Sequence, residues 1–249
     1  SITSILSGYR TLLPAAVEIV LESRFYVFTY VTNWGEESAP SPVSEMIEVD
    51  QNDTTTVAVP ALAVSVPLYA SPPYGEITHW RLYRSSTSNT GAAYQLVPYP
   101  DPDTQKGFPI ATLSVSDANL QEELQEVCPT FTWMEPPADL IGLMGMPNGI
   151  MAGFFGKTLC FAEPFHPYAW PVEYQLTVEY NIVGLGVFGQ TLIVLTEGNP
   201  YFVSGADSAS MSSQKMESTQ ACMSKRSIAS VEGGVIYASP DGICIAGPT

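Results

Sequence analysis

The residues best suited to contact a ligand or a partner lie together in residues 163–171, which read Glu-Pro-Phe-His-Pro-Tyr-Ala-Trp-Pro. Aromatic rings offer flat faces for stacking, and side chains in a proline-stiffened loop lose little entropy when they dock on another molecule. A histidine between two prolines is more often packed than catalytic. We therefore predict a subunit or ligand contact loop formed by Phe165, His166, Tyr168 and Trp170.

Two carboxylates near these rings, Glu163 and Glu173, leave a glycosidase open as an alternative. Such an enzyme needs two carboxyl groups about 5 to 10 Å apart across a cleft, which the sequence alone does not indicate. The sequence has few residues suited to nucleophilic or zinc catalysis. Its only histidines are His79 and His166, and it carries no G-x-S-x-G or H-E-x-x-H sequence. We predict a protein that is not an enzyme and holds no cofactor or metal.

Residues 184–189, Gly-Leu-Gly-Val-Phe-Gly, match the dinucleotide-binding pattern G-x-G-x-x-G. That pattern binds a pyrophosphate only when a helix follows, because the amides of the helix N-terminus receive the anion. Here residues 190–196, Gln-Thr-Leu-Ile-Val-Leu-Thr, follow and are typical of a strand. A nucleotide-binding enzyme would need a helix after Gly189, so we predict that the glycines serve a tight hairpin and close strand packing.

Composition excludes several classes of partner. The 249 residues carry 9 basic and 25 acidic side chains, a formal net charge of −16, and neither half is basic: residues 1–130 carry −10 and residues 131–249 carry −6. Proteins that grip nucleic acid or anionic membranes need clustered cations. Residues 182–195, the longest apolar candidate, are interrupted by glycines, so we expect no membrane span.

The cysteines also predict no special chemistry. Cys128, Cys160, Cys222 and Cys244 are far apart and lack C-x-x-C spacing, so we expect buried free thiols. The 19 glycines and 21 prolines interrupt the chain too often for long helices and indicate a β protein with many turns.

The first domain is predicted over residues 24–128 as a fibronectin-like or immunoglobulin-like β-sandwich. Short runs rich in β-branched and aromatic residues recur about every ten residues, with turn residues between them. These runs are 24–32, 45–49, 54–66, 77–84 and 94–97. A short helix over 118–127, capped by Ser116 or Asp117, is expected to end the domain. Residues 1–23 are predicted as a lead-in that belongs to the following body.

That body is predicted over residues 129–249, after a proline-stiffened linker at 133–138. Gly156, Gly189 and Gly233 each lead into an apolar strand, and they lie 33 and 44 residues apart, close to the roughly 40-residue period of a propeller blade. Residues 208–232 are predicted as a loop followed by a strand. Three blades do not close a ring, since propellers have about four to eight, so we expect an incomplete β-propeller-like array in a longer natural chain. A β-sandwich with repeated hairpins is the alternative.

Several strings together resemble a family of bacteriophage and prophage virion structural proteins, in which a fibronectin-like module sits in a propeller-like body of the tail or neck. The strings are 30–42, 80–84, 138–143, 147–149, 161–171, 225–227 and 236–242. In architecture the chain is similar to the nozzle proteins of short-tailed phages, which form rings around the DNA path.

The resemblance implies a non-enzymatic virion component of the tail tube, nozzle or head-to-tail adaptor, assembled in the host cytoplasm. It implies a homo-oligomeric ring that contacts other virion proteins, while DNA passes through during genome ejection without specific binding. Two rivals remain: a carbohydrate-binding or receptor-binding β module that uses the loop around Phe165 and Trp170, and a β-propeller glycosidase.

Overall fold

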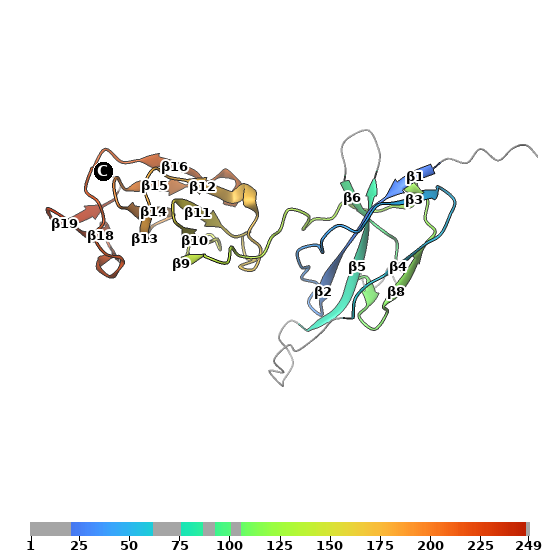
Figure 1. Cartoon of the computed structure of the whole chain (residues 1–249). Helices are drawn as coiled ribbons and strands as arrows, with labels where there is room; N and C mark the ends of the chain where they lie inside the picture. The colour runs from blue at the N-terminus through green and yellow to red at the C-terminus, as the bar shows by residue number, and fades with distance from the viewer. Residues whose placement is uncertain (1–20, 62–75, 87–92, 101–105, 248–249) are drawn as a thin grey trace, which may run out of the picture. The chain divides into compact units, whose positions relative to one another are not determined.

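The chain forms two compact units, divided between Phe131 and Thr132. The computed structural model describes residues 21–61, 76–86, 93–100 and 106–247 (Figure 1). Strands dominate the described parts of both units and all of the strand pairs are antiparallel, so the predicted mainly β class is confirmed. Of the expected lead-in over residues 1–23, residues 21–23 belong to a strand of the first unit, and residues 1–20 lie outside the described residues.

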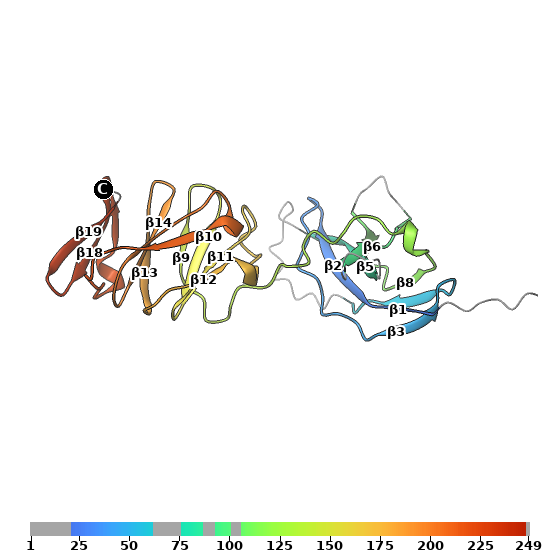
Figure 2. The same ribbon diagram turned by 90° about the horizontal axis from the view of Figure 1, so that it is seen from above.

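The described residues of the first unit form three small sheets. Its central sheet has the order β2-β5-β6, with β7 also paired to β5, while β1 pairs with β3 and β4 with β8 (Figures 1 and 2). The strands are β1 (Leu21–Arg24), β2 (Tyr26–Thr32), β3 (Ile47–Asp50), β4 (Thr55–Ala58), β5 (Ile77–Ser86), β6 (Ala93–Leu96), β7 (Phe108–Pro109) and β8 (Ser114–Asp117). The predicted runs contain β1 to β6 in part or whole, whereas β7 and β8 were not predicted.

Both faces of the central sheet are apolar. Along β5, Trp80 and Leu82 belong to one buried cluster with Tyr26, and Tyr83 belongs to a second cluster on the opposite face with Val27. This alternation is what period-two spacing of apolar residues produces in a strand. The sheet is therefore a central layer that needs cover on two sides.

The edge of β2 is covered by a proline-containing segment rather than by a regular strand. Ser38, Ser41 and Ser44 lie three residues apart, and their backbone amides donate to the carbonyls of Tyr30, Phe28 and Tyr26 respectively, at 2.8–2.9 Å. Each serine hydroxyl in turn accepts from the amide of the same strand residue, at 2.9–3.1 Å.

Three residues of this segment stand against two residues of β2, so each repeat holds one extra residue, as in a β-bulge. The two prolines of this segment, Pro40 and Pro42, do not fall at the hydrogen-bonding serine positions, so their missing N–H groups cost no edge bond. For this region the sequence predicted only turn residues between the runs 24–32 and 45–49.

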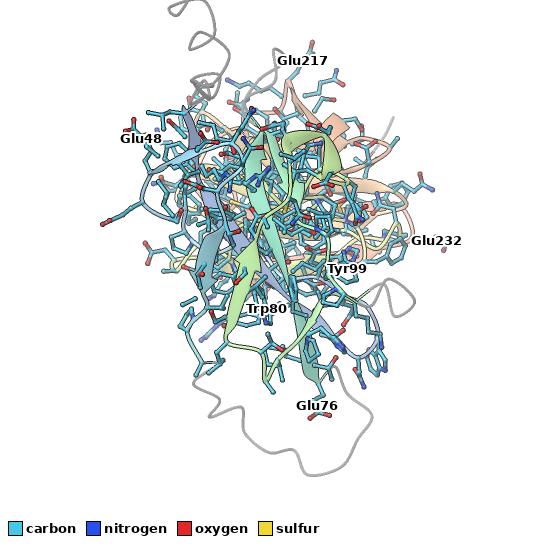
Figure 3. The ribbon with its side chains drawn as sticks, turned by 90° about the vertical axis from the view of Figure 1, so that its right-hand side faces the viewer. Glu48, Glu76, Trp80, Tyr99, Glu217 and Glu232 are labelled. Carbon is cyan, nitrogen blue, oxygen red and sulfur yellow. The ribbon has the colours of Figure 1, made fainter. Side chains whose placement is uncertain are left out.

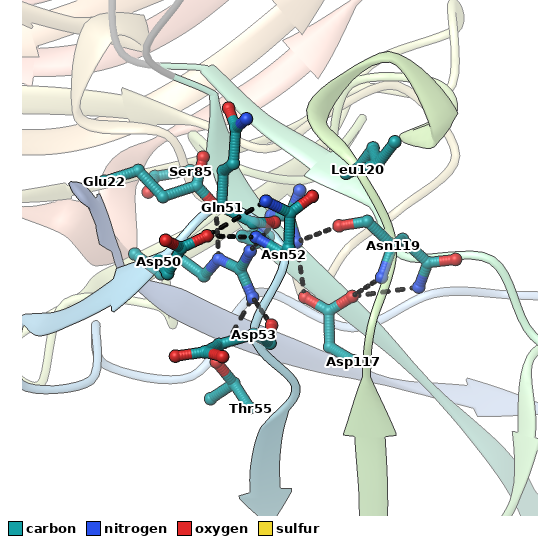
Figure 4. Close-up of polar contacts among 12 residues, drawn as sticks. Glu22, Asp50, Gln51, Asn52, Asp53, Thr55, Ser85, Asp117, Asn119 and Leu120 are labelled. Carbon is teal, nitrogen blue, oxygen red and sulfur yellow. Dashed lines mark hydrogen bonds and ion pairs between the residues drawn. The ribbon is translucent and has the colours of Figure 1, made fainter. Parts of the chain in front are cut away.

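A buried ion pair joins β5 to the end of β8. Arg84 Nη1 lies 2.8 Å from Asp117 Oδ2, and both side chains are almost fully buried. Figure 4 shows Asp117 with its hydrogen-bond partner Asn119. Tyr26 donates its hydroxyl to the same carboxylate oxygen at 2.9 Å, and the Asn119 amide donates to the other at 3.1 Å. Burial alone raises the pKa of Asp117, but hydrogen bonds from Asn119 and the charge of Arg84 outweigh it and hold that pKa below its usual range.

This use of Asp117 explains why the predicted helix over 118–127 is wrong. The structure forms only a single 3-10 turn there, η2 (Gln121–Glu123), preceded by Leu120 in extended conformation. The Asp117 carboxylate accepts hydrogen bonds from Tyr26, Arg84 and Asn119 instead of capping a helix, and Leu124 is buried in the main apolar cluster of the unit. Tertiary packing overrides the local helical spacing.

The second unit contains three meandering sheets in chain order, which we call the first, second and third sheets. The first has the order β12-β11-β10-β9, the second β13-β14-β15-β16 and the third β17-β18-β19 (Figure 2). The strands are β9 (Ile141–Gly145), β10 (Met151–Phe155), β11 (Thr158–Phe161), β12 (Gln175–Thr177), β13 (Ile182–Phe188), β14 (Thr191–Thr196), β15 (Tyr201–Ser204), β16 (Ser212–Lys215), β17 (Ala229–Val231), β18 (Gly234–Ser239) and β19 (Gly242–Ala246).

The three sheets are joined face to face by two apolar cores. One core holds Phe154 and Phe161 of the first sheet against Leu192 and Val194 of the second. The other holds Ile193 of the second sheet, on the opposite face of β14, against Val235 and Tyr237 of the third. The second sheet is thus sandwiched, which is the packing relation of neighbouring propeller blades.

Gly156, Gly189 and Gly233 mark hairpin turns, but these turns do not fall at equivalent places in the three sheets. Gly189 and Gly233 precede the second strands of their sheets, β14 and β18, whereas Gly156 precedes β11, the third strand of the first sheet. The apolar strands predicted after the three glycines are present as β11, β14 and β18. β9, β12 and β16, which have weak apolar alternation, were not predicted. In residues 208–232 the predicted final strand is present as β17, whereas the predicted loop before it also contains the strand β16.

All four cysteines are free thiols, as expected. Cys128, Cys160 and Cys222 are buried and Cys244 is half-buried, and burial raises the pKa of Cys160 to about 11. Within the described part of the chain, no helix has both the length and the apolar character to cross a membrane.

The buried ion pair gives a stability prediction. Replacement Asp117→Ala leaves Arg84 buried without its charge partner, and we expect the free energy of unfolding of the first unit to fall by about 3–5 kcal/mol. Hydrogen exchange of peptides from β2 and β5 across a urea series measures this loss. Glu48→Ala, which removes an exposed carboxylate, is the control and should change stability by less than about 0.5 kcal/mol. Equal protection in both variants would contradict the assignment.

Candidate contact surface at the aromatic loop

The loop of residues 163–171 connects β11 to the 3-10 turn η3 (Val172–Tyr174) at the start of β12. Its ends are joined by the Glu163 amide, which donates to the Ala169 carbonyl at 2.9 Å, and its tip is closed by the amides of His166 and Ala169, each donating to a carbonyl three residues earlier at 3.0 Å. The Trp170 amide donates to the Met134 carbonyl at 2.9 Å. The loop is therefore ordered by its own backbone and by the preceding segment.

Phe165 stands at the tip in a conformation that is unusual for a bulky residue. Its φ is 63°, in the left-handed region, and its side chain is 77% exposed. The Phe165 amide donates to the Gly149 carbonyl at 2.9 Å, and a Cβ on Gly149 would come within 2.4 Å of the Phe165 ring. Strained residues held in place by their surroundings are found mostly at functional positions, so Phe165 fits the predicted contact role.

Two of the predicted residues meet a third ring that sequence analysis did not include. Ring centroids of His166 and Trp133 are 4.9 Å apart, those of Tyr168 and Trp133 are 5.9 Å apart, and those of His166 and Tyr168 are 5.7 Å apart. We call Trp133, His166 and Tyr168 the aromatic cluster. The signal available in the sequence was a tryptophan placed just before the paired prolines Pro136 and Pro137, in a segment treated only as a linker.

Trp170 has a different place from the other predicted contact residues. Only 3% of its surface is exposed, and it packs with Cys160 and Ala162 on the outer side of the first sheet. Its indole N–H donates to the Pro167 carbonyl at 2.9 Å. The side chain therefore anchors the loop and presents no contact surface.

The polar groups of the loop are engaged with the loop itself. His166 donates through Nδ1 to the Pro164 carbonyl at 2.9 Å, because a carbonyl oxygen can only accept. Glu163 Oε2 accepts from the Tyr174 hydroxyl at 2.9 Å, and burial together with this hydrogen bond raises the pKa of Tyr174 to about 12. Glu173 is exposed on η3. The Glu163 carboxylate is thus engaged with Tyr174.

The glycine-rich pattern at 184–189 is a packing feature, as predicted. Gly184 and Gly186 lie within β13, and β14 follows as a strand. A Cβ on Gly186 would come within 2.6 Å of the Val235 side chain in the third sheet, and one on Gly184 within 2.4 Å of Ile228. These glycines let the second and third sheets approach closely.

Comparison with known proteins adds no assignment. No family model matches the sequence, and no curated protein matches it. What the loop can do chemically therefore rests on its geometry. Exposed Phe165 and the adjoining aromatic cluster offer ring faces and edges for stacking or for apolar contact with a partner.

Proposed function

We propose that the protein is a non-enzymatic structural component of a bacteriophage virion, in the tail tube, nozzle or head-to-tail adaptor. It acts by homo-oligomeric assembly with other virion proteins around the DNA path. The observation that carries the proposal is the combination of two β units with a rigid, exposed aromatic loop in a sequence that resembles such virion proteins. A loop with this geometry suits a fixed contact between subunits, because its side chains lose little entropy on docking.

The acidic surface supports a role near DNA that does not involve binding it. Exposed glutamates point outward from both units, as Glu48, Glu76, Glu217 and Glu232 do in Figure 3. Where such protomers surround a channel, their carboxylates repel DNA phosphates. The genome then slides through the channel during ejection instead of adhering to its wall.

Electron microscopy tests the assembly role. We expect a symmetric ring from the purified protein, and antibody labelling of phage particles that carry the protein should fall on the tail or neck. Particles that lack the label there, with a purified protein that forms no ring, would contradict the proposal.

The charge mechanism is tested by reversal of exposed acids. Replacement of Glu48, Glu76, Glu217 and Glu232 by lysine changes the formal net charge from −16 to −8, two units for each reversal. We expect the original protein to leave duplex DNA unbound in a filter assay at about 50 mM salt, and the lysine variant to retain more DNA than the original protein does. That difference should disappear by about 200 mM salt. The same four residues changed to glutamine are the control. Retention of DNA by the original protein would contradict the mechanism.

A second function, recognition of a carbohydrate receptor, is favoured by the aromatic cluster alone. Aromatic rings at a surface stack on sugar rings, and Trp133 and Tyr168 are placed for this. On a glycan array, Trp133→Ala and Tyr168→Ala should weaken binding about tenfold. Trp34→Ala, which removes another exposed indole from the first unit, should leave binding unchanged. If no glycan binds, or if Trp34→Ala weakens binding equally, this second function is excluded.

A further inference from the structure

The hairpin between β9 and β10 brings together the groups of a self-modification reaction. Its turn contains Asn148 and Gly149, the only asparagine–glycine pair in the sequence. Such a pair reacts within itself when the backbone nitrogen of the glycine attacks the side-chain carbonyl carbon of the asparagine, and the side-chain nitrogen leaves as ammonia. In a folded protein this reaction requires an open nucleophile, a polarised carbonyl and a short separation between them.

The nucleophile is the backbone nitrogen of Gly149, and the fold requires a residue without a side chain there. Gly149 has a φ of 78°, in the left-handed region that favours glycine. A Cβ at this position would come within 2.4 Å of the Phe165 ring. The nitrogen is therefore not shielded by a side chain of its own residue. Its N–H donates to the Met146 carbonyl at 3.2 Å, at the long and weak end of the usual range.

The electrophile is the side-chain carboxamide of half-buried Asn148, and a backbone amide is directed at its oxygen. The Ile150 amide donates to Asn148 Oδ1 at 3.4 Å. Negative charge develops on that oxygen when the carbonyl carbon is attacked, and an N–H already directed at it stabilises the charge. Hydrogen bonds of this kind are often long at rest and tighten during the reaction. The same bond keeps the carboxamide beside the peptide unit that contains the Gly149 nitrogen.

We propose that Asn148 is a self-modification site that converts to aspartate and isoaspartate without an enzyme. The Gly149 nitrogen forms a bond to Asn148 Cγ and gives its proton to solvent. The bond from Cγ to Nδ2 breaks, and the leaving nitrogen takes a proton from solvent and departs as ammonia. Water then opens the resulting cyclic imide: cleavage at Cγ gives aspartate, and cleavage at the backbone carbonyl gives isoaspartate. Water is the only co-reactant, and no group is oxidised or reduced.

The conversion has a consequence for the aromatic loop. The Gly149 carbonyl accepts from the Phe165 amide at 2.9 Å, and Phe165 is held at a strained φ of 63°. Isoaspartate adds one carbon to the main chain just before Gly149 and places a carboxylate where a neutral amide stood. Gly149 then shifts against Phe165, and the hydrogen bond that holds the loop tip is lost. The reaction therefore releases Phe165 from its strained conformation.

The reaction is independent of the proposed function, because it needs only the hairpin and water. It limits how long the aromatic loop keeps its geometry. Glycine is required at position 149 for the close approach of Phe165, and that same glycine makes Asn148 reactive. One pair of residues therefore builds the loop tip and also sets its chemical lifetime.

Incubation of the purified protein in water enriched in heavy oxygen tests the reaction. Peptide mapping by mass spectrometry then measures the heavy oxygen at each asparagine position, so conversion during digestion in ordinary water is not counted. We expect Asn148 to convert about tenfold faster than Asn52 or Asn181, which are followed by residues with side chains. Conversion in the folded protein should be at least as fast as in urea, since the turn already holds the reacting groups together. Slower conversion in the folded protein would overturn the proposal.

Hydrogen exchange measures the consequence for the loop. In protein aged until Asn148 is converted, the peptide that contains Phe165 should exchange faster than in fresh protein. Asn148→Gln is the matched control: it keeps a carboxamide, but its longer side chain requires a larger ring, so it should neither gain heavy oxygen nor change its exchange with age. Asn148→Asp adds the charge without the extra backbone carbon and should leave Phe165 protected. Conversion without faster exchange at Phe165, or exchange in fresh Asn148→Asp as fast as in the aged protein, would contradict the link between the hairpin and the loop.

Discussion

An apolar sheet face must be covered, and this constraint governs the structure at every level. In the first unit the central sheet is apolar on both sides and is enclosed by two separate clusters. In the second unit the second sheet is buried on both faces by its neighbours. The burial of apolar area supplies the main favourable free energy, while hydrogen bonds keep the buried strands satisfied.

Close approach of the sheets depends on where side chains are absent. Gly186 and Gly184 lie in β13, an edge strand of the second sheet, at points where a single added carbon would overlap Val235 or Ile228. A glycine within a strand weakens it, because it adds backbone entropy to the unfolded chain and has no side chain to pack. Here that cost is offset by the contact between the second and third sheets. The G-x-G-x-x-G pattern at residues 184–189 is thus explained by the packing of the second sheet against the third.

Polar groups in the first unit also hold the sheets together, because they join strands that are distant in sequence. The Arg84–Asp117 pair links β5 to β8 in the interior, and Ser38, Ser41 and Ser44 satisfy the edge of β2 from a segment that cannot form a regular strand. The pair explains why the helical spacing after Asp117 produces only one 3-10 turn. Local propensity is worth a few tenths of a kcal/mol for each residue, and a buried carboxylate with several hydrogen bonds outweighs it.

The sequence by itself determined the mainly β class, the strongly alternating strands such as β2, β5 and β14, and the exclusion of a helix after Gly189, because period-two patterning and turn residues act locally. It also located the aromatic loop. Only the tertiary structure decided which rings of that loop are available: Trp170 is buried, whereas Trp133, from a segment about 30 residues earlier, joins His166 and Tyr168. Edge strands such as β9 and β16 were likewise decided by their neighbours. Burial and ring contacts depend on residues brought together from distant parts of the chain, and no local pattern encodes that proximity.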